Sequence, residues 1–383
     1  MAIHVQTDFP GANACAVETL VIGDTDVVRF AAAPHGGTEA LWFCLRVAEC
    51  SDRPVELVLT NIDTLLGGAA GWQNVRPVVR QAAGTWERAE PALVRSLPDG
   101  RQHAVWRVRP RYDSFEFALC YPYGVADMEI ARVATQDYWR LDEIGVTGAG
   151  RRLPRLSNGC GVAPPQAPGV YLVARQHAGE TPGSWVLDGL LRSAAGSVAP
   201  EALLIWAVPL ANLDGVVAGD YGKDPFPHDL NRAWGAPPMR HEVHVIGQDL
   251  RRWAGRCRPQ LVVDLHAPAP AEADGAYFFL PRAAAPPAQL AACQAALAAI
   301  LPALPAELLH PQPARQPSYP SRWNPEATIG RFAWEELRVP ALSLETPYSA
   351  CRELVLTRDH YRRLGAALLD GICAWCSRAL PPA

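Results

Sequence analysis

The amino-acid sequence predicts an α/β protein in which an N-terminal antiparallel β-sandwich, residues 1–125, precedes a larger mixed-sheet α/β domain, residues 126–383. Two observations lead to this prediction. Up to about residue 125 the chain shows only short strand patterns separated by turns, which is typical of a sandwich. From about residue 126 helix and strand patterns alternate, which indicates a mixed or mostly parallel sheet. At 383 residues the chain is long enough for both parts.

The expected strands of the first part are short, partly alternating and rich in β-branched and aromatic residues. They span residues 41–47, 55–60, 75–79, 105–108 and 114–119. Turn residues separate them, as in Leu65-Gly-Gly and Pro98-Asp-Gly. We find no catalytic constellation within this part of the sequence.

The second part alternates apolar strand patterns with helical ones. Its expected strands span residues 171–174, 201–208, 261–265, 275–280 and 339–344. Ser184 is placed to cap a helix that carries Trp185 and Leu187 on one face. Residues 353–379 are expected to form a closing helix.

Composition excludes several classes of protein. The net charge of −4 gives no reason to expect nucleic acid or an anionic membrane as a partner. The N-terminus lacks a basic start followed by a long apolar run, so a secretory signal is not expected. Glutamines and prolines interrupt the most apolar segment, residues 283–309, so it does not read as a membrane span. The ten cysteines lie among apolar residues, which suits buried thiols in a reducing compartment and predicts a cytoplasmic protein.

Metal-ligating residue types stand at the ends of two of the expected strands. His177 and Glu180 follow the run 171–174, and His266 comes directly after the run 261–265. Ligands of open α/β sheets bind beyond the carboxyl ends of the strands. Two imidazoles and one carboxylate can hold zinc and leave a fourth position for water. The alternative interpretation is that His177 and Glu180 belong to a surface turn and that His266 is a hydrogen-bonded structural residue. The presence of all three in this order disfavours that interpretation.

A further carboxylate, Glu345, ends the strand pattern 339–344. Next to a metal, such a carboxylate can take a proton from water and pass it to a leaving amine. Without a metal, a salt bridge or a helix cap would explain it equally well. Asp264 precedes His266 by two residues on the same strand face, where it can orient the imidazole.

The run Asp229-Leu-Asn-Arg232 places an amide, Asn231, beside a guanidinium. The planar fork of an arginine matches a carboxylate in a bidentate way, so this pair can hold an anion. The same run can also be a helix start that Asp229 caps.

Together these runs resemble the zinc metallocarboxypeptidases, and most closely bacterial-type members of the cytosolic carboxypeptidase branch. Some members of that branch remove glutamates from protein tails, and the branch carries a β-sandwich before its zinc carboxypeptidase domain. The runs that carry the resemblance are His177-x-x-Glu180, Asn212-Leu-Asp-Gly215, Asp229-Leu-Asn-Arg232-x-Trp234, Asp264-Leu-His266 and Leu344-Glu345. The N-terminal part matches through Arg76-Pro77, Trp86 and Phe117-Ala-Leu-Cys-Tyr-Pro-Tyr123.

The resemblance implies a role for each of these side chains. One Zn²⁺ per chain would be held by the two histidines and Glu180, with Glu345 as the general base. Asn231 and Arg232 would hold the terminal carboxylate of the substrate. Arg331 would lie in the pocket for the last side chain, where a buried guanidinium favours an acidic residue.

The chain departs from the branch in Gly219-Asp-Tyr-Gly-Lys223, where related enzymes carry an arginine that polarises the scissile carbonyl. Lys223 is the only lysine, against 34 arginines, so ordinary surface charge in this chain comes from arginine. We therefore expect Lys223 to supply the missing cation; the alternative is that a lone lysine falls there by chance. For the tyrosine that caps the substrate in many of these enzymes, Tyr319 and Tyr348 are both candidates.

The expected function is hydrolysis of the C-terminal peptide bond of peptide or protein tails, with a preference for acidic tails. An aspartoacylase-like amidohydrolase of N-acyl amino acids is an alternative, because such enzymes share a His-x-x-Glu and an Asn-Arg. The N-terminal sandwich argues against that alternative. A non-catalytic binder of peptide tails is a second alternative, but it would be expected to have lost a ligand or the base.

Overall fold

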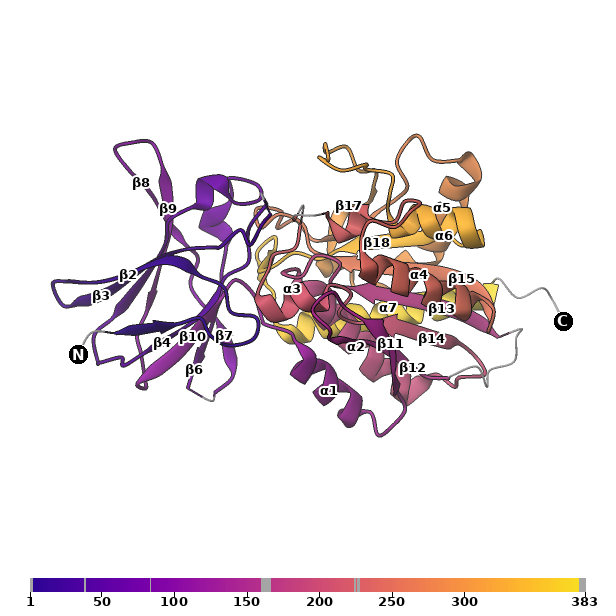
Figure 1. Ribbon diagram of the computed structural model, residues 1–383, viewed down its shortest axis with the longest axis horizontal. Coiled ribbons are helices and arrows are strands. Elements are labelled where there is room, and N and C mark those ends of the chain that lie inside the picture. Colours follow the sequence, from indigo (N-terminus) through magenta and orange to yellow (C-terminus); the bar gives the residue numbers. More distant parts are fainter. Residues whose placement is uncertain are drawn as a thin grey trace.

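The computed structural model describes residues 3–37, 39–82, 84–159, 167–223, 225 and 228–378. Figure 1 shows the strands β1 to β10 gathered at one end of the molecule and the helices with most of the later strands at the other. This arrangement confirms the predicted fold class. The change from strands alone to helices and strands lies between residues 118 and 125, and we retain 125 as the proposed domain boundary.

The N-terminal part contains two five-stranded sheets, in the orders β1-β4-β10-β6-β7 and β2-β3-β5-β9-β8. Neighbouring strands are antiparallel except β3 and β5, which run parallel. The strands are β1 (His4–Gln6), β2 (Cys15–Ile22), β3 (Thr25–Ala31), β4 (Cys44–Ala48), β5 (Val55–Leu59), β6 (Val78–Gln81), β7 (Trp86–Arg88), β8 (Leu93–Ser96), β9 (Gln102–Val108) and β10 (Ser114–Ala118).

Aromatic rings from both sheets form the core of this part. The rings of Phe43 and Phe117 stack at 5.5 Å between centroids, and Phe30 meets Phe43 edge-on, also at 5.5 Å. Phe43 and Phe117 lie within the predicted strands 41–47 and 114–119, whereas Phe30 lies in β3, which the sequence analysis did not predict. The hairpin of β2 and β3 was not expected. Most side chains of β2 are exposed, so its pattern lacks a buried face, but β3 is mostly buried and was simply missed.

The second part is built on an eight-stranded sheet in the order β11-β12-β14-β13-β15-β18-β16-β17. Its four central strands, β14, β13, β15 and β18, run parallel to one another. The strands are β11 (Arg140–Val146), β12 (Arg152–Ser157), β13 (Pro168–Ala174), β14 (Leu204–Val208), β15 (Arg258–His266), β16 (Ala276–Phe279), β17 (Leu309–Arg315) and β18 (Ala341–Glu345), with β19 (Ala350–Cys351) and β20 (Leu354–Val355) as a separate pair.

Helices cover both faces of this sheet (Figure 1). On one face Tyr171 of β13 packs on Trp253 of α4, and on the other Gly183 of α2 lies close to Leu265 of β15. The helices are α1 (Val125–Ala134), α2 (Thr181–Ser197), α3 (Leu213–Ala218), α4 (His241–Ala254), α5 (Pro287–Ile300), α6 (Ile329–Leu337) and α7 (Arg358–Arg378). Single 3-10 turns occupy Ile62–Thr64, Trp72–Asn74, Leu230–Arg232, Leu301–Ala303 and Ala306–Leu308. Among the described residues, no helix has the length and apolar character that crossing a membrane requires.

The expected N-cap of the helix that carries Trp185 and Leu187 is wrong by four residues. Helix α2 begins at Thr181, and Ser184 lies inside its first turn, buried. The N-cap position belongs to Glu180, and the proline after Thr181 fits the first turn of a helix because its missing N–H needs no partner there. The hydroxyl of Ser184 instead accepts a hydrogen bond from the guanidinium of Arg175. This start places Glu180 at the positive end of the helix.

An arginine of the sandwich joins the two parts of the molecule. The guanidinium of Arg88 donates to the carbonyl oxygens of Tyr348, at 2.6 Å, and Leu356, at 2.8 Å. It also donates to the hydroxyl of Tyr361 at 3.0 Å. These acceptors lie in the segment 348–361, which follows Glu345 and the end of β18. The sandwich therefore helps to hold this segment in place.

Candidate active site

The site forms at the carboxyl ends of three adjacent parallel strands. β13 ends at Ala174, β15 at His266 and β18 at Glu345. His266 and Glu345 are direct neighbours in the register of β15 and β18. Their side chains therefore point to the same face of the sheet, as the strand-end rule predicts for open α/β sheets.

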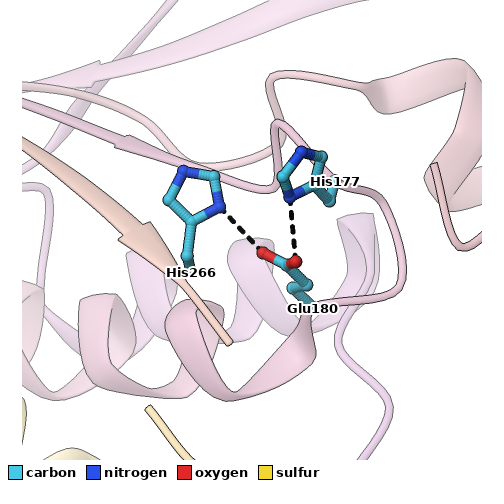
Figure 2. Close-up of side chains that lie close together, drawn as sticks. All are labelled: His177, Glu180 and His266. Atoms are coloured by element: carbon cyan, nitrogen blue, oxygen red, sulfur yellow. Dashed lines mark hydrogen bonds and ion pairs between the residues drawn. The ribbon is translucent and has the colours of Figure 1, made fainter. Parts of the chain in front are cut away.

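The proposed metal ligands converge on a single carboxylate (Figure 2). The Nδ1 atom of His177 lies 2.8 Å from Oε1 of Glu180, and Nδ1 of His266 lies 2.8 Å from Oε2. All three residues are buried. His177 comes from the bend after β13, Glu180 from the start of α2 and His266 from the end of β15, so three elements contribute one residue each.

The outer nitrogen of each imidazole faces an aspartate. Nε2 of His266 lies 2.7 Å from Oδ2 of Asp264, and Nε2 of His177 lies 3.3 Å from Oδ1 of Asp229. Such carboxylates orient an imidazole and direct its other nitrogen to a metal. The sequence predicts this role for Asp264, and the pairing of Asp229 with His177 emerges only from the structure.

Gln176, which sequence reasoning missed, connects these groups. Its side-chain amide donates to Oδ2 of Asp264 at 2.6 Å and to Oδ1 of Asn231 at 3.3 Å. Its carbonyl oxygen accepts a hydrogen bond from the indole of Trp234 at 2.7 Å. The only signal in the sequence is its position directly before His177, which does not distinguish it from other loop residues.

The donor set fits a divalent metal of the zinc type. Ligand atoms of His177, Glu180 and His266 all lie within 4.8 Å of one another. Burial lowers the pKa of both imidazoles, but the surrounding carboxylates outweigh it and raise both pKa values above the ordinary one. Burial raises the pKa of Glu180, yet the two imidazoles together bring it below its usual value. A buried group of nitrogen and oxygen donors that favours positive charge so strongly suits a dication.

The loop that carries His177 and Glu180 packs on the loop that leads to Lys223. The N–H of Gly179 donates to the carbonyl of Tyr221 at 2.8 Å. A Cβ on Gly179 would lie 2.6 Å from the ring of Tyr221, and one on Gly222, whose φ is +80°, would lie 2.6 Å from the backbone of Ala178. Only glycine allows this close approach, and the approach brings Lys223 to the site.

Lys223 is half-buried beside the proposed catalytic groups. Its Nζ lies 5.9 Å from the centre of the ring of Tyr319. Burial lowers the pKa of Lys223, but the carboxylates of Glu180 and Glu345 raise it above its ordinary value, so the side chain stays an ammonium. In the part of the chain that the structure describes, no carboxylate lies within ion-pair distance of it.

Glu345 lines the cavity with a carboxylate that has an unpaired oxygen. Its Oε2 is buried and has no hydrogen-bond partner among the residues that the structure describes. The pKa of Glu345 is raised to about 7, mainly by burial. His266 and Lys223 oppose this rise, and the nearby carboxylate of Glu180 adds to it. A carboxylate with a pKa near neutrality can both accept and return a proton.

Arg232 is buried, 5% exposed, with a guanidinium that has no carboxylate partner among the described residues. Its Nη1 donates to the backbone carbonyl of Asn231 and its Nη2 to the hydroxyl of Tyr319, at 3.1 Å, while Nε has no partner. Asp229 caps this turn by accepting from the N–H of Asn231 at 2.8 Å. The capping and anion-binding interpretations of this run are therefore compatible, because the cap turns the guanidinium toward the cavity.

The structure distinguishes the two candidate tyrosines. Tyr319 is 38% exposed and contacts Arg232, whereas Tyr348 is 2% exposed and lies beneath the site. Tyr319 also lies under the guanidinium of Arg282, 5.2 Å from its ring centre, and lines the cavity. Only Tyr319 is placed to contact a bound substrate.

Two cavities meet at Glu345. The first, about 320 Å³, contains Arg232, His266 and Glu345 and extends past Arg282 and Arg331. The second, about 330 Å³, lies on the sandwich side of Glu345. Its lining includes Glu39, Leu66, Lys223, Asp229, Arg232, Glu272, Phe279, Tyr319, Arg322 and Glu345.

The expectation of a buried Arg331 is wrong. Its side chain is 49% exposed, and its Nε donates to Glu335, four residues later on α6, at 2.6 Å. The guanidinium still lines the first cavity, at its rim. The sequence did not show that Arg331 is exposed. Helix α6 is amphipathic, and only the structure shows that Arg331 lies on its outer side.

Two family models match separate parts of the chain. Residues 5–120 match the family model described as cytosolic carboxypeptidase N-terminal domain. Residues 166–351 match the model described as succinylglutamate desuccinylase/aspartoacylase catalytic domain. Cytosolic carboxypeptidase 6 of Mus musculus is 26% identical over 208 residues, which cover 48% of this chain and 38% of that protein. The aligned region thus spans about two-fifths of the length of that relative.

Solved structures share the fold over the whole chain. A metallo-carboxypeptidase from Burkholderia cenocepacia superposes with a TM-score of 0.76 at 20% identity, covering 98% of this chain and 99% of that one. A metallo-carboxypeptidase from Pseudomonas aeruginosa, in complex with (2-guanidinoethylmercapto)succinic acid, superposes with a TM-score of 0.76 at 18% identity, covering 97% and 98%. At these identities the similarity establishes the fold.

Proposed function

We propose that the chain is a zinc-dependent carboxypeptidase of the cytosolic carboxypeptidase branch, a proposal supported by the match of residues 5–120 to the cytosolic carboxypeptidase N-terminal model and by the 26% identity to cytosolic carboxypeptidase 6. It removes the last residue of a peptide or a protein tail. The observation that carries this proposal is the buried guanidinium of Arg232, whose Nε has no hydrogen-bond partner among the described residues and which lines the same cavity as His266 and Glu345. An anion-binding group beside a hydrolytic centre favours substrates that end in a carboxylate.

Each side chain has a defined task in this proposal. A zinc ion held by His177, Glu180 and His266 would supply a Lewis acid for the water and the scissile carbonyl. Glu345 accepts the proton of the attacking water and returns it to the leaving amine. The ammonium of Lys223, held near Glu180 and Glu345, stabilises the developing oxyanion.

Substrate binding falls to the groups around Arg232. Its guanidinium and the amide of Asn231 hold the terminal carboxylate. The hydroxyl of Tyr319, already a hydrogen-bond partner of Arg232, closes the site over the substrate. A non-catalytic role is disfavoured, since the three proposed ligands and the proposed base are all present and lie close together.

Deacylation of N-acyl amino acids is a second candidate function. It is favoured by the match of residues 166–351 to the succinylglutamate desuccinylase/aspartoacylase catalytic model. Such substrates also end in a carboxylate that Arg232 would hold. The N-terminal sandwich, with its match over residues 5–120, favours the peptidase.

A substrate panel tests both candidates and the preference for the last side chain. We expect the zinc-loaded protein to cleave peptides that end in Glu or Asp faster than peptides that end in Leu or Lys, and N-acyl amino acids least. The physical reason is that Arg331 and Arg282 both line the cavity for the last side chain. Arg331→Ala should reduce the preference for acidic over apolar ends by about two- to fivefold, as expected for a half-exposed charge pair. Mass spectrometry of the products gives both the bond cut and the rates.

The exposed Arg252 of α4 supplies a matched control. Arg252→Ala should leave the ranking of substrates unchanged. A protein that prefers Leu, or whose preference survives Arg331→Ala, would exclude Arg331 as the determinant. Faster turnover of N-acyl amino acids than of any peptide would favour the second candidate function.

Replacing Lys223 tests the source of oxyanion stabilisation. We expect Lys223→Ala to lower kcat by about a hundredfold, or about 2.7 kcal/mol in activation free energy, because a preorganised cation is lost from the site. Zinc content should stay the same, since Lys223 is not among the proposed ligands. Steady-state kinetics with elemental analysis of zinc measures both quantities.

Lys223→Arg provides the rescue control, because it restores the positive charge with a different shape. It should recover part of the lost rate. Full activity in Lys223→Ala would refute the role of the ammonium. A loss of zinc in that variant would instead assign Lys223 to the integrity of the metal centre.

A further inference from the structure

We propose that the second cavity, on the sandwich side of Glu345, binds a cationic amine carried by the residue before the scissile bond, and that Glu39 selects it. The inference rests on the proposed carboxypeptidase function and adds a specificity-determining residue from the N-terminal sandwich. The amine is either the free α-amino group of a dipeptide or the side chain of a penultimate lysine.

The two cavities would hold the two sides of the scissile bond, one on each side of Glu345. Arg232, Phe279, Tyr319 and Glu345 line both cavities, so the terminal carboxylate and the scissile bond belong at their junction. The first cavity extends away from this junction to α5 and α6 and takes the last side chain. The residue before the scissile bond must therefore leave through the second cavity.

The sandwich builds the outer wall of this second cavity. Glu39 forms an antiparallel backbone bridge with Lys223 of the catalytic part. The N–H of Leu66, which also lines the cavity, donates to the carbonyl of Ala40 at 3.0 Å. A Cβ on Gly71, whose φ is +81°, would lie 2.3 Å from the Cβ of Ala271, so the sandwich loop is pressed against the loop after His266. Backbone contacts on both sides thus hold Glu39 at the cavity.

Glu39 is the carboxylate of this cavity that remains available for a ligand. Asp229 is paired with His177 and with the backbone of Asn231, and Glu272 accepts from Tyr277 at 3.0 Å. Glu345 is the proposed base. By contrast, Oε2 of Glu39 is buried and has no hydrogen-bond partner in the described part of the chain.

The cations that line the cavity do not satisfy Glu39. No described arginine or lysine lies within 4.0 Å of its carboxylate as an ion pair, Lys223 included. Lys223 is drawn more strongly by Glu180 and Glu345 than by Glu39. A desolvated carboxylate without a partner is costly, and an ammonium from the substrate would remove that cost. A carboxylate at the same position of the substrate would be repelled.

The test compares peptides with the same last residue, using the full-length protein loaded with zinc. The acetylated tripeptides Ac-Ala-Lys-Glu, Ac-Ala-Ala-Glu and Ac-Ala-Glu-Glu vary only the penultimate side chain. The pair Ala-Glu and Ac-Ala-Glu varies only the α-amino group. We expect a cationic amine to raise kcat/KM by about tenfold or more over the neutral peptide, the size expected for one charged hydrogen bond. Which pair shows the effect identifies the source of the amine.

Glu39→Gln keeps the shape of the side chain and removes its charge. It should bring the ratio of kcat/KM between cationic and neutral peptides close to one. Glu39→Lys should invert the ratio in favour of Ac-Ala-Glu-Glu. Glu87→Gln, at an exposed glutamate of β7, is the matched control and should leave the ratio unchanged.

The outcomes separate this inference from the proposed function. Cleavage of all peptides without a preference for a cation, or a preference that survives Glu39→Gln and Glu39→Lys, would overturn the role of Glu39 and leave the carboxypeptidase intact. If the zinc-loaded protein cleaves none of the peptides, the proposed function falls and this inference with it. Thermal unfolding curves of each variant show whether a lost ratio comes from a lost fold.

Discussion

The double replacement His177→Ala and His266→Ala is expected to remove bound zinc and abolish peptide hydrolysis. Both imidazoles direct Nδ1 to Glu180 at 2.8 Å, so their loss leaves a single carboxylate ligand, which cannot retain the ion. Elemental analysis after dialysis measures the metal directly. Added zinc should raise the melting temperature of the wild-type protein and not that of the variant, because only a folded site binds the ion.

His244, an exposed histidine of α4, is the matched control. His244→Ala should keep one zinc per chain and full activity. Stoichiometric zinc in the double variant would show that the metal binds elsewhere, whatever happens to the rate.

Glu345→Gln is expected to retain zinc and lower kcat by about a thousandfold, within the range that general acid–base groups contribute. The amide has the size of the carboxylate but cannot take the proton of the attacking water. KM should change little, because Asn231 and Arg232, not Glu345, hold the terminal carboxylate in our proposal. Steady-state kinetics with zinc analysis measures all three quantities.

Glu353→Gln changes an exposed glutamate eight positions further along the chain and should have no effect on kcat. A Glu345→Gln protein within a few-fold of the wild-type rate would show that another group is the base. A loss of zinc in that variant would place Glu345 among the ligands.

The order of residues in the sequence was sufficient to predict the centre of this site. His266 and Glu345 each end an apolar strand. Adjacent parallel strands bring their carboxyl ends together independently of the conformation of the connecting loops. The same rule places His177 and Glu180 there, since they follow β13 within one turn. The central strands β13, β14, β15 and β18 were equally predictable, because their apolar patterns reflect the core of the sheet, whereas the buried strands β3 and β12 were missed.

The positions of side chains away from the strand ends, on loops and on α6, were not predictable in this way. Tyr319 and Tyr348 are similar in sequence context, yet one lies in the cavity and the other beneath it. The family resemblance placed Arg331 in the pocket for the last side chain, but its outward position on α6 leaves it paired with Glu335. The exposure of Arg331 depends on which face of α6 packs against the sheet, and the sequence of a short helix is compatible with more than one packed face.

The sequence by itself was sufficient to predict the two-part fold class, to single out the three proposed metal ligands and to identify Lys223 as the only lysine. The tertiary structure alone decided that Glu39 and Lys223, 184 positions apart, share one cavity wall. It also decided that Gln176 joins Asp264 to Asn231. The physical reason is that strand ends converge through local patterns that a sequence displays, whereas contacts between a sandwich loop and a catalytic loop arise from docking two surfaces.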